Sequence, residues 1–571
     1  MNLSRREALR LGFIGAGVWC LPLRGSGEAL AALPCPDQAR CLAHHPQEPA
    51  GPYVPSRFSP QIPRFQRPFE PLEVRLGQDL GGGLDGYRIT MRPATVEIIP
   101  GISTPVWTYD GLLPGPCIRQ TKGRGSVVRF VNLLQDSSGL GVDTSIHLHG
   151  MASLPQYDGY AEDLIPFEHY KDYYYPNNKG GPFWYHDHAI GRTSRNVYMG
   201  LAGMYLVDYD DCDFVNPAQA EFLPSGETDI PMVIQDRRLD GDGQLLFNDN
   251  LQRSLYGDVM LVNGVPWPRL QVRDRKYRLR ILNGGTSRVL QLGAQADIDG
   301  RPMPLPLVVV ASDSGLLSLP VPTRFLRMGV AERYEVIIDF TGLAGREVFL
   351  INPIQAVNRD TDLRTTAVLC FDVVRGPADS TPLPQTLGRL TPIERLRSEV
   401  RRPVRVFRLD RVGSQWVINN RGWNPDHVEA FVDPCATEIW RFVNPGGGWV
   451  HPLHIHLGHF RLLSRNGVPP LPHESGMKDT FYVGDFQTVD VIGRFGPHEG
   501  RYMFHCHNLV HEDHDMMSQF QVGRGGCNPC GAPARPLPEP PTFDEEIGVP
   551  DKECSTDDPS GCAADATTST V

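Results

Sequence analysis

Residues 505–516 read HCHNLVHEDHDM. A single cysteine, Cys506, stands between two histidines, and His511 and Met516 follow it by five and ten residues. One thiolate, imidazoles and a distant thioether are the ligands of a blue-copper electron-transfer site, which uses a cysteine, two histidines and a weak axial methionine. The stretch supplies three of these four ligands, and the spacing favours Met516 over Met517 as the axial one.

The two histidines that flank Cys506 predict a second metal site. Neighbouring residues of a strand face opposite sides, so His505 and His507 cannot reach the metal of Cys506. We expect them to bind copper on the other side of the strand. The backbone around Cys506 would then join two copper centres by a short path for electrons.

Three further His-x-His pairs occur in the chain. Residues i and i+2 lie on one face of a strand, so both imidazoles of a pair can reach the same interface. With the pair around Cys506, they offer eight imidazoles, which suits three copper ions with positions left open for oxygen. His451 precedes His454 by three residues and supplies the second imidazole of the blue site, if a turn sends the two to different metals. The three further pairs are His147/His149, His186/His188 and His454/His456.

The chain also repeats itself, which predicts three domains of one type. Strands ending at Asn132, Asn283 and Asn444 recur, and His-x-His pairs follow only the first and the third. Short alternating strands between turn residues favour β-sandwiches. The middle domain would be a spacer without copper. The predicted segments are 32–70 (extended), 71–215, 225–375 and 401–525 (sandwich domains), 376–400 (linker) and 526–571 (flexible tail).

Composition agrees with an exported all-β protein. The chain has 571 residues, 58 of them glycine and 52 proline, and a net charge of −11, which argues against a nucleic-acid partner. Residues 1–31 predict a signal peptide, with Arg5-Arg6 before a short apolar run, as in the Tat route to the periplasm or the exterior. No other stretch is apolar enough to span a membrane.

The cysteines fit an oxidising compartment. Apart from Cys20 and Cys506, ten of the 12 cysteines could pair there, in a connectivity that the sequence leaves open. Cys527 and Cys530 form a CxxC after the last predicted strand, where a structural disulfide or free thiols are the expected states.

The motifs HLHG, WYHDH, HPLHIHL and HCHNLVHEDHDMM resemble those of the multicopper oxidases, in particular the branch of spore-coat laccase, phenoxazinone synthase and bilirubin oxidase. The resemblance covers nearly all of residues 71–525 and includes VNGVPWPRLQV at 262–272, MKDT at 477–480 and FGPHEGRY at 495–502. It implies three cupredoxin-like Greek-key β-sandwich domains that hold one type 1 copper, one type 2 copper and a type 3 pair. The implied ligands are Cys506, His451, His511 and Met516 (type 1), His147 and His454 (type 2), and His149, His186, His188, His456, His505 and His507 (type 3).

The same resemblance implies a reaction. A small reducing substrate, such as a phenol, an aminophenol or a bilirubin-type tetrapyrrole, would give electrons one at a time at the type 1 site, where the edge of His511 would face the substrate cleft. Dioxygen would take four electrons at the other coppers and leave as water. Because this reduction consumes protons, Glu512 and Asp158 are the expected acids or proton relays.

Three other functions compete with this interpretation. A metal-ion oxidase of the same family would act on cuprous or manganous ions, and the lack of a methionine-rich insert weakens only the cuprous form. A copper-free exported scaffold would lack Cys506 or several histidines, which are all present. A simple electron carrier would need only the four type 1 ligands.

Overall fold

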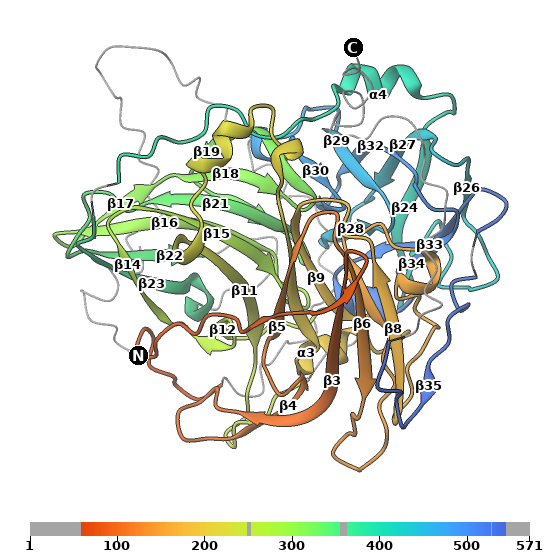
Figure 1. Cartoon of the computed structure of the whole chain (residues 1–571), viewed down its shortest axis with the longest axis horizontal. Helices are drawn as coiled ribbons and strands as arrows, with labels where there is room; N and C mark the ends of the chain where they lie inside the picture. The colour runs from red at the N-terminus through yellow and green to blue at the C-terminus, as the bar shows by residue number, and fades with distance from the viewer. Residues whose placement is uncertain (1–58, 248–252, 354–362, 378, 527, 544–571) are drawn as a thin grey trace.

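The computed structural model describes residues 59–247, 253–353, 363–377, 379–526 and 528–543. Within these ranges the chain forms six β-sheets that pair into three sandwiches (Figure 1), so the predicted all-β class is confirmed. The predicted signal peptide, 1–31, and most of the extended segment 32–70 lie outside the described residues.

The first sandwich carries two His-x-His pairs on β7 and β9. Strand β9 is buried along its whole length, as expected of a strand that is covered on both faces. Its sheets have the orders β1-β5-β10-β9-β7 and β2-β3-β6-β8-β35, with β4 on β3. The strands are β1 (Val74–Arg75), β2 (Gln78–Gly81), β3 (Leu84–Val96), β4 (Thr104–Tyr109), β5 (Gly115–Thr121), β6 (Gly125–Asn132), β7 (Ile146–His149), β8 (His169–Tyr175), β9 (Gly181–Asp187), β10 (Ala202–Asp208) and β35 (Arg535–Pro536).

The second sandwich lies between the other two in the chain and has the largest apolar core. Its sheets have the orders β13-β12-β11-β15-β21-β18-β19 and β14-β23-β22-β16-β17, with β20 on β16. The strands are β11 (Asp229–Arg237), β12 (Val259–Val262), β13 (Val265–Pro266), β14 (Arg269–Arg273), β15 (Lys276–Asn283), β16 (Leu290–Ile298), β17 (Arg301–Leu305), β18 (Leu307–Ser312), β19 (Gly315–Thr323), β20 (Leu326–Met328), β21 (Arg333–Asp339), β22 (Glu347–Ile351) and β23 (Ala367–Val374).

The third sandwich carries Cys506 and the remaining pairs on β28 and β33. Its sheets have the orders β25-β24-β27-β32-β29-β30 and β26-β34-β33-β28-β31. The strands are β24 (Arg405–Val412), β25 (Gln415–Ile418), β26 (Ala430–Val432), β27 (Thr437–Val443), β28 (His451–Ile455), β29 (His459–Arg465), β30 (Met477–Lys478), β31 (Thr480–Val483), β32 (Thr488–Arg494), β33 (Gly500–Cys506) and β34 (Met517–Val522).

Helices are short and lie between strands. Helix α4 occupies the end of the predicted linker and packs on β27 and β32. None of the helices in the described ranges is long and apolar enough to cross a membrane. The α-helices are α3 (Thr193–Met199), α4 (Ile393–Glu399) and α5 (Leu509–Asp513). The 3-10 turns are η1 (Pro155–Tyr157), η2 (Asp211–Asp213), η3 (Pro217–Phe222), η4 (Gly226–Thr228), η6 (Leu363–Thr366) and η7 (Pro472–Glu474).

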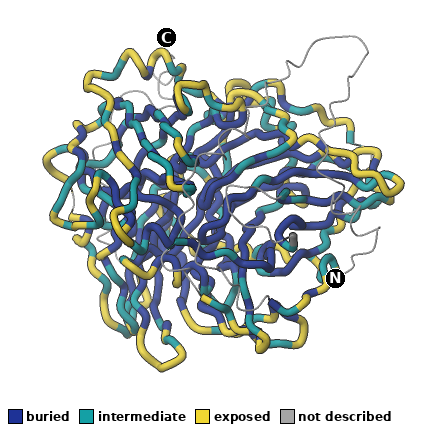
Figure 2. The backbone as a smooth tube through the Cα atoms, turned by 180° about the vertical axis from the view of Figure 1, so that it is seen from behind, coloured by how far each residue is buried: buried dark blue, intermediate teal, exposed yellow. Residues whose placement is uncertain are grey.

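The three sandwiches meet in a buried centre. Trp184 of the first, Val233 of the second and Leu509 of the third belong to one apolar cluster, and Figure 2 shows buried backbone running through the middle of the molecule. Arg333 of β21 strengthens this junction, because it donates to the Pro182 carbonyl of the first sandwich and to the Asp479 carboxylate of the third.

The segment after the last sandwich returns to the first one. Strand β35 pairs antiparallel with β8, and Arg129 donates to the carbonyls of Pro540 (2.6 Å) and Thr542 (2.9 Å). Glu539 forms an ion pair with Arg88. Residues 528–543 therefore form a C-terminal strap across the first sandwich, where the composition predicts a flexible tail; 544–571 lie outside the described residues.

The cysteines divide into two groups. Cys212 and Cys435 are each in a disulfide, whereas Cys117, Cys370, Cys506 and Cys530 are free. Cys530 of the CxxC is free, and Cys527, the other cysteine of that motif, lies outside the described residues.

A buried ion cluster in the third sandwich gives a test of stability. Glu474 accepts hydrogen bonds from Arg465 (2.6 Å) and Arg327 (3.5 Å). Burial alone would raise the pKa of Glu474, but the two arginines outweigh burial and lower this pKa to about 2. We expect Glu474→Gln to lower the free energy of unfolding by about 3 kcal/mol at neutral pH, the usual effect of leaving a buried charge unpaired.

The pH dependence follows from the sign of this shift. A depressed carboxyl pKa stabilises the fold above the unfolded pKa, near 4.5, and that contribution is lost as the pH falls toward 2. In thermal unfolding, the stability difference between wild type and Glu474→Gln should therefore be complete at pH 7 and decrease below pH 4.5. Glu394→Gln, on the exposed face of α4, is the control; equal effects of the two substitutions would contradict the argument.

Candidate metal centre

Cys506, His451 and His511 form a compact buried group, here called the thiolate cluster. The Sγ of Cys506 lies 3.4 Å from Nδ1 of His451 and 3.6 Å from Nδ1 of His511, and the two Nδ1 atoms lie 3.2 Å apart. Ligands about 2.0–2.3 Å from one tetrahedral metal ion are separated by roughly such distances. Met516 is fully buried in the same core, and its carbonyl accepts from the Cys506 amide at 3.0 Å.

Strand alternation separates this cluster from the neighbouring histidines. Cys506 ends β33 and faces the core of the third sandwich, so His505 and His507 face the other way. The same rule corrects one expectation. His451 and His454 need no turn between them, because they lie on the unbroken strand β28 at an odd spacing, which places them on opposite faces.

The four His-x-His pairs come together between the first and third sandwiches and form what we call the histidine cage. Each sandwich presents its pairs in the same register: His147 lies opposite His186 on β7 and β9, and His454 lies opposite His505 on β28 and β33. The sequence repeat is therefore also a repeat of strand pairing. All eight rings are buried; they belong to His147, His149, His186, His188, His454, His456, His505 and His507.

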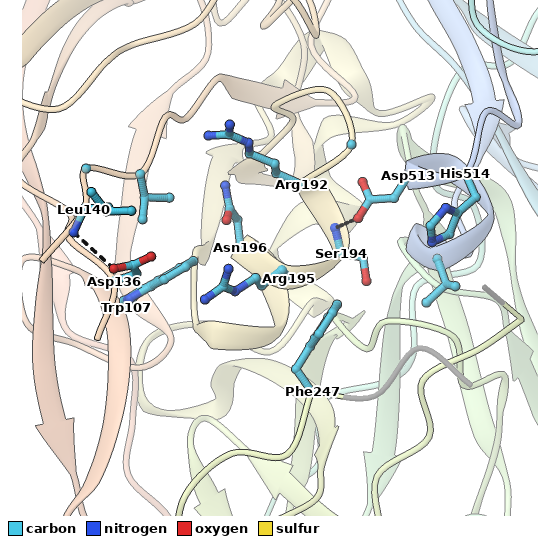
Figure 3. Close-up of a pocket in the computed structure, with 14 residues that line it drawn as sticks. Trp107, Asp136, Leu140, Arg192, Ser194, Arg195, Asn196, Phe247, Asp513 and His514 are labelled. Carbon is cyan, nitrogen blue, oxygen red and sulfur yellow. Dashed lines mark hydrogen bonds between the residues drawn. The ribbon is translucent and has the colours of Figure 1, made fainter. Parts of the chain in front are cut away.

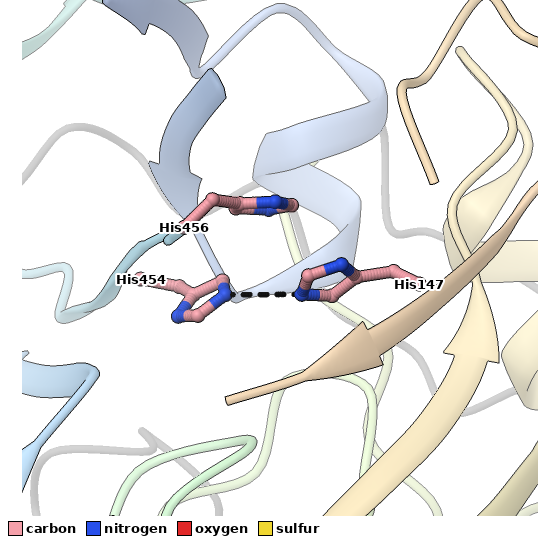
Figure 4. Close-up of side chains that lie close together, drawn as sticks. All are labelled: His147, His454 and His456. Carbon is pink, nitrogen blue, oxygen red and sulfur yellow. Dashed lines mark hydrogen bonds between the residues drawn. The ribbon is translucent and has the colours of Figure 1, made fainter. Parts of the chain in front are cut away.

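The cage interlocks across the domain boundary. Nε2 of His147 lies 3.3 Å from Nε2 of His454 (Figure 4), and the His147 ring stacks on His456 with centroids 4.0 Å apart. Nε2 of His505 lies 3.2 Å from Nε2 of both His188 and His456. Residues more than 300 positions apart thus share single sites. Groups able to hold one ion include His147/His454/His456, His149/His186/His507, His188/His456/His505 and His149/His454/Asp479.

The chemistry of the cage fits metal ions better than protons. Burial and the neighbouring imidazoles lower the pKa of His147 and His454 well below the ordinary histidine value, so these rings are neutral and offer lone pairs. Nδ1 of His149, Nε2 of His186 and both ring nitrogens of His507 are buried without a hydrogen-bond partner. Such orphaned nitrogens are costly unless something binds them.

The thiolate cluster leads to the same conclusion. Burial raises the pKa of the Cys506 thiol and lowers the pKa of His451 to about 3, so the empty cluster would hold a neutral thiol beside neutral imidazoles. A bound cation removes the thiol proton outright. Cysteine and two histidines, with a methionine in the same core, are the donor set of copper rather than of magnesium or calcium.

Both predicted carboxylates lie against the cage. Oδ2 of Asp158 accepts from Nδ1 of His456 at 2.7 Å, and the Asp158 carbonyl accepts from Nδ1 of His147 at 2.5 Å. Oε2 of Glu512 lies 3.0 Å from Nδ1 of His505. Burial raises the pKa of Asp158 well above its usual range. Burial thus favours the protonated form of Asp158 next to the cage.

Asp479 is a residue to which the sequence analysis gave no role. Its carboxylate accepts from Nε2 of His149 at 3.0 Å, and its carbonyl accepts from Nδ1 of His454 at 2.9 Å. Arg333 binds the same carboxylate through two nitrogens, at 2.6 and 2.7 Å. Such partners orient ligand rings and are part of a metal site. The signal was available, since Asp479 lies in the MKDT motif.

Two tryptophans were also missed. Trp416 stacks on His511 with centroids 3.8 Å apart, and Trp184 stacks on His186 at 4.0 Å.

The edge of His511 was expected to face a substrate cleft, yet His511 is fully buried and its Nε2 donates to the Arg253 carbonyl at 2.9 Å. Within the described residues that edge is therefore covered.

Comparison with known proteins agrees with this geometry. The family model described as multicopper oxidase matches residues 90–211 and 399–526, the parts that carry the metal-binding residues. The chain is 37% identical over 528 residues to a bilirubin oxidase from Albifimbria verrucaria, covering 89% of this chain and 88% of that one. It is 31% identical over 503 residues to a laccase from Bacillus subtilis (strain 168), covering 76% and 94%.

Solved structures show the same architecture. A multicopper oxidase from the hyperthermophile Aquifex aeolicus superposes with a TM-score of 0.71 at 28% identity, and the match covers 80% of this chain and 99% of that one. The sandwiches are thus cupredoxin-like, and the cofactor is copper, as type 1, type 2 and type 3 centres. The chain belongs to the multicopper oxidase family and is a laccase-like oxidoreductase that uses dioxygen.

Proposed function

We propose that this enzyme oxidises phenols, aminophenols or bilirubin-type tetrapyrroles and reduces dioxygen to water. The observation that carries the proposal is the direct connection between the thiolate cluster and the histidine cage, since Cys506 lies between His505 and His507 in one strand and loop. Copper supplies one-electron redox chemistry and the binding of dioxygen. The protein supplies the ligands, their orientation and the protons.

The ligand roles in this proposal are those that the family resemblance implies, and His456 lies within reach of two of the clusters. His451, Cys506 and His511, with Met516, hold the type 1 copper. His147 and His454, whose Nε2 atoms face each other, hold the type 2 copper. The remaining cage residues hold the type 3 pair: His149, His186, His188, His456, His505 and His507.

Proton supply is assigned to the two carboxylates. Glu512 lies beside His505 and, at 3.6 Å, beside His188, so it serves the side of the cage formed by these two histidines. Asp158 serves the side formed by His456 and His147. Asp479 keeps His149 and His454 in place from the third sandwich.

The substrate class is tested by direct comparison. Copper-loaded enzyme should contain four copper ions per chain, be blue, and oxidise 2-methoxyphenol, 2-aminophenol and bilirubin faster than Cu(I) or Mn(II). Oxygen consumption and substrate loss are measured together, with four one-electron oxidations per dioxygen. Faster turnover of Cu(I) or Mn(II) would instead establish a metal-ion oxidase, and a colourless protein with full copper would refute the type 1 assignment.

We further propose that the protein is exported by the Tat route to the periplasm or the exterior. The twin arginines, Arg5 and Arg6, support this, as do the disulfides of Cys212 and Cys435, which are typical of oxidising compartments. Residues 1–31 fused to a reporter should export it in a Tat-competent host, and Arg5→Lys with Arg6→Lys should retain it in the cytoplasm. Export without the arginines would indicate the ordinary secretory route.

A further inference from the structure

A cavity of about 440 Å³ lies between α3 and α5, outside the histidine cage and the thiolate cluster (Figure 3). All three domains line it: Arg195 on α3 of the first, Phe247 of the second and Val510 on α5 of the third. Its size is that of small-molecule sites, which span roughly 300–1,000 Å³. We call it the α3–α5 cavity.

Exposed apolar and aromatic side chains gather in this cavity. Phe247 is 39% exposed and Leu140 is 67% exposed, although both are large hydrophobic residues. Trp107 lies on the same side as Leu140, and Figure 3 shows Arg195 between Trp107 and Phe247. Exposed apolar groups that converge on one hollow indicate a binding site rather than chance exposure. A flat aromatic ligand fits these walls.

Arg195 gives the cavity a positive charge, which interacts electrostatically with the Asp136 carboxylate. Its guanidinium lies 5.1 Å from the Trp107 ring centroid and makes no ion pair with any residue that the structure describes. Arg192, one turn away, is already held by Asp143 at 3.0 Å. Asp136 lines the cavity too, but one oxygen of its carboxylate accepts from Ser138 and Leu140 of its own loop. A guanidinium on an aromatic face is well placed to bind a carboxylate with two hydrogen bonds.

The wall nearest α5 has unmet hydrogen-bonding groups. Ser194 is 1% exposed, and its Oγ has no hydrogen-bond partner. Its amide donates to Oδ2 of Asp513 at 2.9 Å, while Oδ1 of Asp513 is also without a partner. Both atoms are closed to solvent, so they belong to the packed contact between α3 and α5 and not to the open surface of the cavity.

The cavity adjoins a route to the type 1 ligands. Val510 in the cavity wall immediately precedes His511. The carbonyl of His514, also in the wall, accepts from the Trp416 amide at 3.1 Å, and the Trp416 ring stacks on His511. The edge of His511 itself is covered by Arg253. A reductant in the α3–α5 cavity therefore reaches the thiolate cluster through α5.

We propose that the α3–α5 cavity binds phenols that carry a carboxylate, with the carboxylate on Arg195 and the ring between Trp107 and Phe247, and that their electrons enter through α5. The proposal rests on the proposed oxidase function. Each phenol loses one electron toward His511 and one proton to water, and becomes a phenoxyl radical. Four phenols give the four electrons that reduce one dioxygen, with four protons, to two water molecules.

The test compares two phenols that differ in the carboxylate. Arg195→Met should raise the KM for 4-hydroxy-3-methoxybenzoate about ten-fold, the effect of losing hydrogen bonds to a charged group, and leave its kcat unchanged. The KM for 2-methoxyphenol should stay within about two-fold. Arg195→Lys should restore part of the loss, because it keeps the charge. Arg346→Met is the matched control: Arg346 is a partly exposed arginine of the second sandwich that pairs with Asp299 and does not line the cavity, so neither KM should change beyond about two-fold.

A binding measurement makes the result independent of turnover. Saturation-transfer NMR on the copper-loaded enzyme should show binding of 4-methoxybenzoate, which has no phenolic hydrogen, and Arg195→Met should abolish it. Unchanged binding and unchanged KM in that variant would overturn the proposal. A rise in the KM for dioxygen alone would overturn it too, because the cavity would then be an oxygen passage. If wild type binds the probe at Arg195 but oxidises neither phenol, the proposed function fails while the binding site stands.

Discussion

Cys506→Ser abolishes the blue colour and lowers oxygen consumption by more than about 100-fold, because loss of a mere supporting group around a metal already costs roughly 10- to 100-fold. The thiolate is the strongest donor of its cluster, with Sγ within 3.4–3.6 Å of both imidazoles. A serine hydroxyl cannot replace it, since it remains protonated and is a hard ligand where copper prefers a soft one. Electrons from the substrate then have no entry to the cage.

Three measurements separate this effect from general damage. The copper count should fall from four ions per chain to three, the visible band should vanish, and the EPR signal of the type 2 copper should remain, because the cage residues lie on the opposite face of β33. Cys117→Ser is the matched control: Cys117 is also free and fully buried, but lies on β5 in the apolar junction of the domains. Intact oxygen consumption in Cys506→Ser would refute the electron path.

Glu512→Gln has the second-largest expected effect. It should keep all four copper ions and the blue colour but slow oxygen reduction about 100-fold, at the lower end of the range of general acid catalysis. Glutamine keeps the size and hydrogen-bonding capacity of the side chain beside His505 but cannot deliver a proton. Electrons should therefore reach the cage at the normal rate, and the reduced enzyme should accumulate.

The diagnostic measurement follows two rates separately: reduction of the blue copper by substrate, and its reoxidation by dioxygen. Without oxygen, a reducing phenol should bleach the blue band of Glu512→Gln as fast as that of wild type, whereas reoxidation by dioxygen should be slow. Asp158→Asn should behave similarly, because Asp158 touches the other side of the cage. Glu438→Gln is the control, since Glu438 is a buried carboxylate of the same domain that binds Arg405 and Trp440 and no histidine. Fast reoxidation of Glu512→Gln would exclude it from proton supply.

Periodicity was enough to predict which side chains share a face. The two histidines of each His-x-His pair are two residues apart and therefore share a face, whereas Cys506 and His505 are adjacent and do not. These spacings predict that the two clusters are separate. The recurring strands that end at Asn132, Asn283 and Asn444 likewise predicted three domains of one type. These are local properties, and strand geometry transmits them directly.

The pairing of distant groups could not be read in this way. Two contacts depend on how the first and third sandwiches dock, which no local pattern encodes: the stacking of His147 on His456 and the hydrogen bond between His149 and Asp479. The covered edge of His511 is a similar case, because Arg253 comes from another domain. The strap was missed for a different reason: its Pro-rich composition resembles a linker, yet a few contacts such as those of Arg129 hold it in place.

Because β35 pairs with β8, the first sandwich can be completed only after the C-terminal strap has been synthesised. On the ribosome, β8 emerges long before β35, on the order of tens of seconds at usual elongation rates. Through that interval β8 is the edge strand of its sheet, and its His169–Tyr170 edge, which β35 covers in the complete chain, is unpaired, a known risk for aggregation. A premature stop codon after residue 526 would leave an intact set of copper ligands on a chain in which this part of the β8 edge is never covered.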